Sequence, residues 1–300
     1  MKSRDLTDLL LLAAIWGSSF LFMRMAVPAF GPVPLAFVRV LGAALMLLPL
    51  LLWRGEWAAL RSRFKPMLVL GLTNSGLPFL CFGYAALTLP AGLAAIFNAA
   101  TPMATALIAW AWLGDPLSRP RAIGLLIGFA GVAGLALNKS LASGALHGLQ
   151  LNLPVALAIA ACLAGTLMYG HAASFTRRYM TGTPSMVLAT GTQAAAALAL
   201  ALPAALTWPA VNPAPQHWAM ALALAALCSA LAYILYFRLL QRIGPTSAAS
   251  VTFLVPVFAS AWGAVVLGEA ITPAMLLGGA VILGGTSLVL GLWPRSARSA

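Results

Sequence analysis

The sequence predicts an all-α integral membrane protein, with ten transmembrane helices that form two inverted five-helix repeats around a central cavity. Three observations lead to this class. Of the 300 residues, 62% are hydrophobic and 7% are charged, whereas about 25% are charged in a soluble domain. Apolar stretches of membrane length follow one another, with Lys and Arg in alternate connections. A five-helix pattern returns 154 residues later.

Ten apolar windows account for most of the chain. One bilayer crossing needs about 20 apolar residues, so ten crossings use about 200 and leave about 100 for connections and tails. The windows lie at residues 6–27, 34–53, 66–87, 90–113, 120–138, 151–176, 185–207, 217–240, 245–267 and 273–293. They are continuous rather than alternating, which favours helices over barrel strands. No room is left for a sizeable soluble domain.

The basic residues indicate the orientation, because short cytoplasmic loops retain Lys and Arg. One side of the predicted membrane holds 14 of the 17 basic residues, namely Lys2, Arg4, Arg54, Arg61, Arg63, Lys65, Arg119, Arg121, Arg177, Arg178, Arg238, Arg242, Arg295 and Arg298. Both termini are therefore expected in the cytoplasm, and the location expected in a bacterium is the inner membrane. The same asymmetry explains the net charge of +12, so no nucleic-acid partner is expected.

An internal repeat connects the two halves. The stretch from Thr101-Pro102 to Leu113-Gly114-Asp115 returns as Val255-Pro256 and Leu267-Gly268-Glu269, 154 residues later. Near the start of each half, Trp16-Gly17 matches Tyr169-Gly170 at an offset of 153 residues. The predicted repeats are residues 1–140 and 150–293, joined by 141–149, and five helices in each require the second to be inverted. Chance matches of Gly and Pro are the alternative; inverted repeats are typical of alternating-access transporters.

Several of these residues carry a resemblance to a known family. The Trp16-Gly17-Ser18-Ser19-Phe20 opening, the helix from Asn98-x2-Thr101-Pro102 to Leu-Gly-Asp, and its repeat ending in Leu-Gly-Glu resemble the EamA type of the drug/metabolite transporter superfamily. Within it, the chain looks most like YddG-type exporters of amino acids, especially aromatic ones. The resemblance covers nearly the whole chain and implies ten helices in a basket around a central cavity.

Charged side chains are nearly absent from the predicted membrane interior. The five acidic residues all lie in tails, loops or helix ends, namely Asp5, Asp8, Glu56, Asp115 and Glu269. This pattern argues against a carboxylate proton relay and against a site for multivalent cations. Arg39 is the one basic residue that could meet an anion in the cavity. Its alternatives are snorkelling to the interface and pairing with a helix-end carbonyl.

The expected cavity lining consists of neutral hydrogen-bonding groups and aromatic rings, which suit a zwitterion or an uncharged amphiphile. The candidate substrate-binding residues are Trp16, Ser19, Asn74, Tyr84, Asn98, Thr101, Tyr169, His171, Tyr233 and Thr252. Each has an alternative explanation. Ser and Thr in membrane helices often bond the carbonyl four residues earlier, Asn often bonds a neighbouring helix, and Tyr233 could be an interfacial anchor.

Three further residues are candidates for moving parts. His171 is the single histidine inside a predicted span, so it is the candidate proton carrier, with an interhelical hydrogen bond as the alternative. Pro102 and Pro256 occupy matching positions in the two halves. Because proline removes a backbone donor and frees a carbonyl, the two are expected to act as paired hinges, unless they serve packing alone.

The expected function is secondary active or facilitative export of small neutral or zwitterionic metabolites, above all amino acids, by alternating access. The sequence contains no catalytic constellation, metal cluster or phosphate-binding loop, and no cofactor is expected. The alternatives are an exporter of other amphiphilic metabolites or drugs, a channel, or a membrane-embedded enzyme. The expected partners are a small-molecule substrate and the lipid bilayer. We expect a monomer, with glycines of the fifth and tenth spans as an alternative dimer seam.

Overall fold

The computed structural model describes residues 3–142, 153–236, 239, 242 and 251–292. All regular elements in these ranges are helices, so the predicted all-α class is confirmed. Nine helical stretches there are long and apolar enough to cross a membrane, and Val251–Leu267 is a shorter apolar helix of 17 residues. Together they follow the predicted spans in order. Residues 143–149 of the predicted connection and 245–250 of the predicted ninth span lie outside the described residues.

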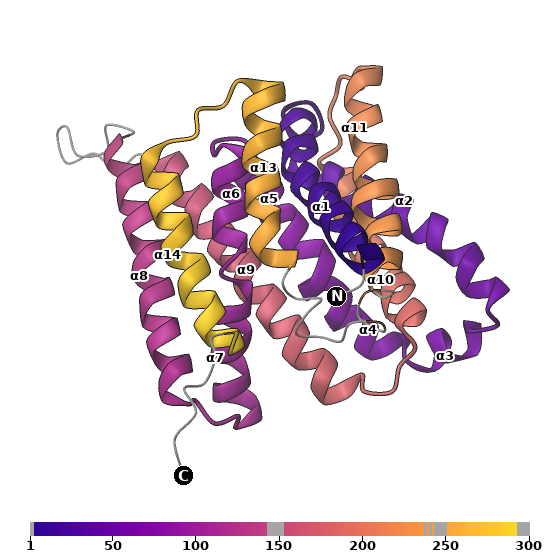
Figure 1. Cartoon of the computed structure of the whole chain (residues 1–300). Helices are drawn as coiled ribbons and strands as arrows, with labels where there is room; N and C mark the ends of the chain where they lie inside the picture. The colour runs from indigo at the N-terminus through magenta and orange to yellow at the C-terminus, as the bar shows by residue number, and fades with distance from the viewer. Residues whose placement is uncertain (1–2, 143–152, 237–238, 240–241, 243–250, 293–300) are drawn as a thin grey trace, which may run out of the picture.

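The first half of the chain supplies five spans (Figure 1). Its helices are α1 (Ser3–Phe30), α2 (Pro32–Trp53), α3 (Trp57–Ser62), α4 (Phe64–Gly71), the π-helical η1 (Leu72–Gly76), α5 (Leu77–Ala86), α6 (Ala91–Asn98), α7 (Thr101–Leu113) and α8 (Arg119–Ala142). The third span is formed by α4, η1 and α5 in succession, and the fourth by α6 and α7. The short α3 connects the second span to the third.

The second half has a similar series of helices. They are α9 (Leu153–Tyr179), α10 (Ser185–Leu206), α11 (Pro215–Ala225), the π-helical η2 (Ala226–Leu231), α13 (Val251–Leu267) and α14 (Pro273–Leu290). The eighth span runs from α11 through η2 to Tyr236. A π-helical segment therefore interrupts both the third and the eighth span, and the two segments begin 154 residues apart, at Leu72 and Ala226.

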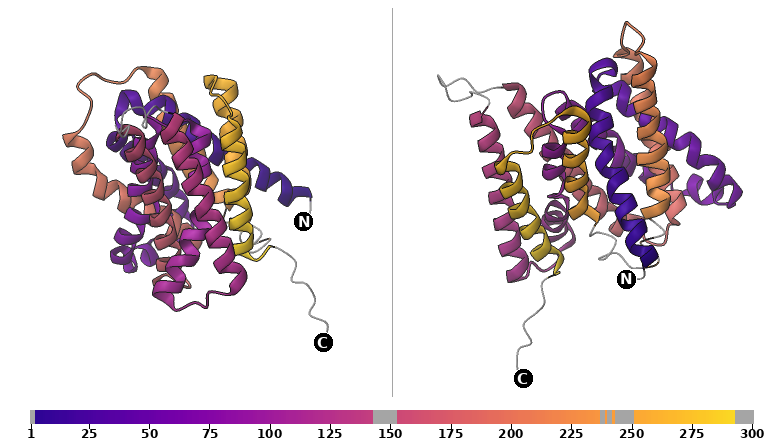
Figure 2. Two further views of the ribbon diagram at one scale, coloured as in Figure 1. Left: turned by 90° about the vertical axis from the view of Figure 1, so that its left-hand side faces the viewer. Right: turned by 45° about the horizontal axis from the view of Figure 1, so that its top comes forward.

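Helices of one half pack mainly against helices of the other. The principal pairs are α8 with α14, α2 with α10, α1 with α13, α5 with α9, and α7 with α9. Figures 1 and 2 show α8 and α14 side by side along one flank of the molecule. The largest hydrophobic core lies among α1, α6, α9 and α13, and includes Leu12, Phe97 and Ala259.

Glycines permit the closest of these contacts. A Cβ at Gly124 of α8 would lie 2.7 Å from the Gly285 carbonyl oxygen, and one at Gly285 would lie 2.6 Å from the Gly124 oxygen. The glycines that suggested a dimer seam thus pack α8 against α14 within the chain. Gly17 is similarly close to Phe258, and Gly170 to Ala104.

The helix ends define two ends of the bundle. At the arginine-rich end, the terminus of α2, the start of α4, and the α7–α8 and α9–α10 connections come together, with Arg63 Nη1 donating to Tyr179 O at 3.3 Å. The basic residues at these helix ends are Arg54, Arg61, Arg63, Lys65, Arg119, Arg121, Arg177 and Arg178. At the opposite end, Phe30 of α1 packs edge-on against Trp218 of α11 at 4.9 Å. This grouping agrees with the predicted asymmetry, while the cytoplasmic side stays a prediction.

The predicted fourth span is a broken helix. The α-helix ends at Asn98, Ala99 and Ala100 form a turn, and α7 begins at Thr101, with Pro102 in its first turn. The carbonyls at the break have partners: Phe97 O accepts from Ala100 N at 3.1 Å, and Ala99 O accepts from the Thr286 hydroxyl of α14 at 3.2 Å. Such partners are what backbone groups need at membrane depth. Pro256, by contrast, lies inside α13, so the paired hinge stays a prediction.

Candidate functional site

Six polar side chains meet near the middle of the bundle, and we call them the central polar cluster. They are Arg39, Asn74, Ser75, Gln193, Ser229 and Tyr233. Arg39 comes from α2, Gln193 from α10, and the others from the two π-helical segments or the turn that follows η2. The cluster therefore draws on two spans of each half of the chain.

Two hydrogen bonds in the cluster are counterparts. Arg39 Nε donates to Ser229 Oγ at 3.0 Å, and Gln193 Nε2 donates to Ser75 Oγ at 3.0 Å. Arg39 and Gln193 lie 154 residues apart in the sequence, and so do Ser75 and Ser229. Gln193 and both serines are fully buried. The same contact is thus made twice. The second span contacts the π-helical segment of the second half, and the seventh span contacts that of the first half.

The π-helical segments explain how these polar groups reach the interior. A π-helical turn accommodates one residue more than an α-helical turn, and such turns occur often at functional sites. Asn74 and Ser75 lie on η1, Ser229 lies on η2, and Tyr233 follows η2 by half a turn. Local helix geometry and polar chemistry therefore coincide in both spans.

Arg39 does not snorkel, so that alternative from the sequence is wrong. The residue is only 5% exposed. Besides Ser229, its guanidinium contacts Met23 Sδ at 3.8 Å, and its Cζ lies 3.6 Å from the centre of the Phe79 ring. All three partners are neutral. Among the described residues, Arg39 is thus an arginine of the interior, which the sequence offered only as a possibility.

Several predicted binding residues surround this arginine. Asn74 Nδ2 donates to Tyr233 Oη at 3.0 Å. Tyr169 and Tyr233 lie within electrostatic range of the Arg39 guanidinium, and the Tyr169 ring stacks on Phe82 at 6.1 Å. Asn74, Tyr169 and Tyr233 are each half-buried. Of the predicted set, these three are brought together with Arg39.

Trp16 lies next to this group. Its ring packs against Tyr236 at 5.4 Å. Ser19, on the same helix, is 5% exposed. Both residues belong to α1, which packs against η2 as well as α11 and α13. The first span therefore supplies an aromatic wall on the side of the eighth span.

The other predicted residues lie elsewhere. Tyr84 is two residues from the end of α5, at the opposite end of the bundle. Asn98 and Thr101 flank the helix break, where the Thr101 hydroxyl donates to Asn98 O at 2.7 Å. Thr252 is half-buried in the first turn of α13. No pattern in the sequence distinguishes these positions from those at the centre.

His171 belongs to an aromatic group towards the arginine-rich end. Its ring stacks on Trp112 at 5.3 Å and lies 5.8 Å from Phe175. The buried His171 Nδ1 has no hydrogen-bond partner in the described part of the chain. The interhelical hydrogen bond offered as the alternative is therefore not formed through this nitrogen, and the role as proton carrier stays a prediction.

Several ion pairs join the halves: Arg242 pairs with Asp5 and Asp8, and two further pairs lie at opposite ends of the bundle. At the opposite end, Arg24 Nε lies 3.4 Å from Glu269 Oε1, and Glu269 Oε2 accepts a hydrogen bond from Ala91 N at 2.8 Å. At the arginine-rich end, both terminal nitrogens of Arg177 bind the Asp115 carboxylate. This contact lowers the pKa of Asp115, which lies outside the spans. Arg24 and Arg177 are 153 residues apart, and the two acids 154.

The Leu-Gly-acid motif positions both carboxylates. Gly114 and Gly268 end their helices with φ of +72° and +66°, in the left-handed region that favours glycine. The acid's own backbone N–H then turns back to the helix: Asp115 N donates to Ala109 O, and Glu269 N to Gly263 O. The motif is thus a helix C-cap that directs an acidic side chain towards an arginine of the other half.

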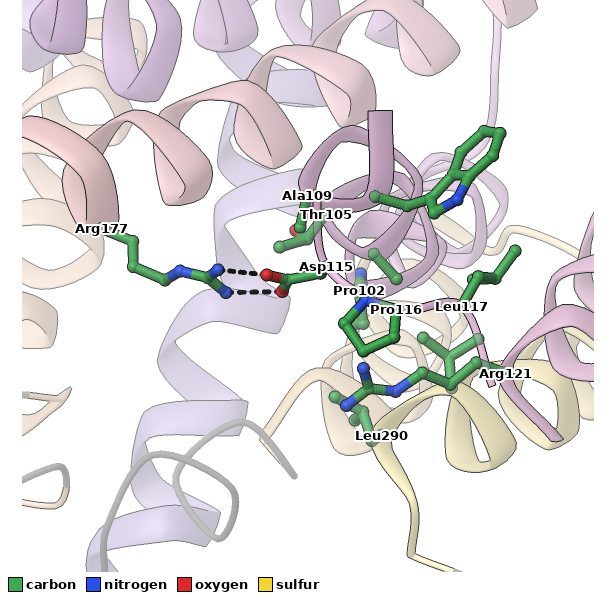
Figure 3. Close-up of a pocket in the computed structure, with 12 residues that line it drawn as sticks. Pro102, Thr105, Ala109, Asp115, Pro116, Leu117, Arg121, Arg177 and Leu290 are labelled. Carbon is green, nitrogen blue, oxygen red and sulfur yellow. Dashed lines mark hydrogen bonds and ion pairs between the residues drawn. The ribbon is translucent and has the colours of Figure 1, made fainter. Parts of the chain in front are cut away.

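A pocket of about 250 Å³ adjoins the Asp115–Arg177 pair. Figure 3 shows Arg177 pointing towards Asp115, with Pro102, Thr105 and Arg121 around the same space. Residues from α7, α8, α9 and α14 line it. The pair therefore borders a space that extends to Pro102 in the first turn of α7.

The sequence reasoning missed Ser75, Gln193 and Ser229. A signal for Gln193 was available, because an amide inside an otherwise apolar span is expensive to bury without a partner. Applying the repeat offset of 154 to Arg39 also leads to Gln193, and applying it to Ser75 leads to Ser229. The serines alone were indistinguishable from those that bond their own helix.

A bundle of membrane-length apolar helices around a buried polar cluster defines a polytopic membrane protein. Comparison with known proteins then gives the family. The sequence model of the EamA-like transporter family matches residues 8–137 and 156–291. The chain belongs to this family. It is a transporter of the drug/metabolite superfamily and not an enzyme.

Individual relatives agree with the family. Protein PecM of Dickeya dadantii (strain 3937) is 27% identical over 278 residues, which cover 88% of this chain and 84% of that protein. An uncharacterized transporter, YvbV of Bacillus subtilis (strain 168), is 31% identical over 136 residues, covering 44% and 43%. A solved crystal structure with 19% identity matches 97% of this chain and 99% of its own, with a TM-score of 0.66, and so has the same fold.

Proposed function

We propose that the protein is a secondary active or facilitative exporter of small zwitterionic or neutral metabolites, above all amino acids, working by alternating access. The observation that carries the proposal is the central polar cluster. It joins both halves of the chain at mid-span, where a transporter of this mechanism needs its binding site. Half-buried aromatic and amide groups there, including Asn74, Tyr169 and Tyr233, offer both an apolar wall and hydrogen bonds.

Paired contacts support the proposal that residues 1–140 and 150–293 form inverted repeats. The Arg39–Ser229 bond has its counterpart in Gln193–Ser75, and the Arg24–Glu269 ion pair in Arg177–Asp115. The close approaches of Gly17 to Phe258 and of Gly170 to Ala104 are related in the same way. Each pair of contacts is exchanged by an offset of 153 or 154 residues. Inverted halves would make such exchanges the natural result of symmetry.

The symmetry-related ion pairs Arg24–Glu269 and Arg177–Asp115 suggest how access alternates. One lies at each end of the bundle, and each ties a helix of one half to a helix end of the other. Rocking of one half against the other would separate one pair while keeping the other closed. The ends would then open in turn around the central polar cluster.

The orientation and energy source are part of the proposal. The arginine-rich end would face the cytoplasm, with both termini on that side of a bacterial inner membrane. Transport would run down the substrate gradient, by exchange, or by weak coupling to protons through His171. The protein would act on a small-molecule substrate within the lipid bilayer and would need no cofactor.

Reconstitution into liposomes tests the proposal. A panel of radiolabelled amino acids is supplied outside, with or without unlabelled amino acid inside. A carrier gives saturable uptake that rises with internal substrate, whereas a channel gives neither. Asn74→Ala and Tyr233→Phe should each raise KM by about 5- to 150-fold, since a lost polar contact contributes about 1–3 kcal/mol. Leu126→Ala, at a 72% exposed position on α8, is the matched control. Absence of saturable uptake for the whole panel would refute amino-acid export.

A further inference from the structure

Arg39 is the charged member of the central polar cluster, and its charge has no balancing group. All five Asp and Glu side chains of the sequence lie in the described part of the chain, and none of them contacts Arg39. Asp5 and Asp8 pair with Arg242, Asp115 pairs with Arg177, and Glu269 pairs with Arg24. Glu56 precedes α3. A buried arginine therefore stands without a carboxylate inside an apolar bundle.

Structural support does not explain the charge. Gln193, the counterpart of Arg39 in the second half, makes the same hydrogen bond to a serine at the same 3.0 Å distance. The two residues also have matching aromatic neighbours. Arg39 lies over the ring of Phe79, and Gln193 lies beside Tyr233, which follows Phe79 by 154 residues. A neutral amide thus suffices for this contact. The arginine brings a positive charge and additional N–H donors that the packing does not require.

The remaining donors of Arg39 have few partners. A guanidinium carries five N–H donors. In the residues that the structure describes, Nε meets Ser229 Oγ, Nη1 meets only the weak acceptor Met23 Sδ, and Nη2 has no hydrogen-bond partner. The half-buried Tyr169 and Tyr233 lie within electrostatic range. Charge and free donors therefore lie within the cluster where the proposed substrate would bind.

We propose that Arg39 binds the carboxylate of the transported molecule, so that the substrate class is an organic monocarboxylate, with or without an amino group. The planar guanidinium and a carboxylate match in charge and in geometry, since two parallel N–H groups can bind two oxygens. Phe79 covers the face of the guanidinium, which leaves its edge for this contact. The inference rests on the proposed function, because it takes transport as given. It does not depend on which amino-acid side chain the substrate has.

A set of three related probes tests carboxylate recognition directly. L-phenylalanine has both groups, 3-phenylpropionate lacks the amine, and L-phenylalaninamide lacks the carboxylate. Matched triplets built on alanine and leucine extend the set to smaller side chains. Thermal unfolding of the purified full-length chain is measured with each probe. In at least one triplet, the amino acid and the acid that lacks the amine should both raise the Tm of the wild type, whereas the amide should not.

Arg39→Gln is the decisive variant, because it reproduces the residue that the second half already uses at the equivalent position. Its apparent affinity for the carboxylates should fall about tenfold or more, to the level of the amide. Without ligand, its Tm should stay unchanged or rise, because an unbalanced buried charge has been removed. Arg61→Gln, which removes a charge from an exposed position on α3, should keep the preference for acid over amide.

The outcomes separate this inference from the proposed function. If 3-phenylpropionate binds through Arg39 but no amino acid is transported, carboxylate recognition stands and amino-acid export fails. If amino acids are transported but the amides bind equally well, or Arg39→Gln keeps the preference for acids, the inference is overturned while export stands. Failure of every carboxylate to raise the wild-type Tm, or a lower Tm for Arg39→Gln without ligand and no loss of discrimination, would overturn it as well.

Discussion

Arg177 holds Asp115 through both of its terminal nitrogens, across the interface between α9 and the connection that follows α7. The pair is solvent-exposed, with the Arg177 side chain 58% and the Asp115 side chain 27% exposed. Exposed ion pairs contribute little to folding stability. Its position beside the pocket at the arginine-rich end instead favours a role in the balance between open and closed conformations.

Asp115→Asn should therefore change access more than stability. We expect little change in Tm, but faster reaction of a cysteine placed at Thr105, which lines the pocket, with a membrane-impermeant thiol reagent. The double variant Asp115→Arg with Arg177→Asp should restore the slow rate, because it rebuilds the pair with its charges exchanged. If the labelling rate of Thr105→Cys is the same with the wild-type pair, with Asp115→Asn and with the exchanged pair, the ion pair does not control access to this pocket.

The pH dependence of the same labelling follows from the lowered pKa of Asp115. The contact with Arg177 favours the charged carboxylate. Its stabilising effect is therefore complete above the pKa of an unpaired aspartate, about 4, and is lost as the pH falls through the lowered value. Labelling at Thr105→Cys, expressed relative to an exposed cysteine at Ala58, should be constant from pH 8 to 5 and rise only below about pH 4. A transition near neutral pH would contradict this assignment.

Glu269 should matter more for stability than Asp115, since its side chain is only 15% exposed and binds two groups. Glu269→Gln loses the ion pair with Arg24 but keeps an acceptor for Ala91 N, whereas Glu269→Ala loses both. We expect Glu269→Ala to lower the free energy of unfolding by about 1–3 kcal/mol and Glu269→Gln by less. Thermal or denaturant unfolding in detergent measures the relative stability of the wild type and the two Glu269 variants. Equal losses would assign the whole effect to the ion pair.

Two adjacent glycines on α14 provide a matched test of packing. A Cβ at Gly285 would lie 2.6 Å from both Gly124 O and Gly128 N, while one at Gly284 would meet nothing within 4 Å. Gly285→Ala should destabilise the protein by about 1–3 kcal/mol by forcing α8 away. Gly284→Ala should be neutral or stabilise by up to about 1 kcal/mol, because alanine is the better helix former. Similar Tm values for the two variants would contradict the close α8–α14 contact.

Cysteine labelling of intact cells tests the proposed orientation. Ala58 on α3 and Ala210, in the connection between α10 and α11, are both exposed and belong to different ends of the bundle. In a background with Cys81, Cys162 and Cys228 replaced by alanine, an impermeant reagent should label Ala210→Cys in intact cells and Ala58→Cys only after the membrane is opened. Labelling of both positions in intact cells would be incompatible with the proposed topology.

The crossings and the all-α class could be predicted from sequence because the bilayer imposes a length and a polarity on each span. The break after Asn98 and the two π-helical segments could not. The break is supported by a partner from another helix, because the Thr286 hydroxyl of α14 binds the Ala99 carbonyl. Pro102 indicated irregular geometry but did not distinguish a kink from a break.

The binding residues were harder to predict, since a polar side chain inside a span can face a neighbour or a cavity. Of the predicted binding residues, Asn74 and Tyr233 form a hydrogen bond with each other, whereas Tyr84 lies near a helix end, away from them. The location of Arg39 was ambiguous because its depth depends on the tilt of α2 and on whether a neighbouring helix offers a neutral hydrogen-bond acceptor. Ser229 provides that group from the other half.

Each π-helical segment can be regarded as a one-residue insertion that the fold has kept in both halves. Successive residues of an α-helix are rotated by about 100°, so removing one residue from η1 would turn Ser75 and Asn74 relative to the part of the span beyond it. The same deletion in η2 would turn Ser229 away from Arg39. Substitutions in these spans therefore alter single contacts, but a change of length by one residue would redirect a whole helical face. We expect homologous chains that share this cluster to tolerate replacement at η1 and η2 far better than insertion or deletion.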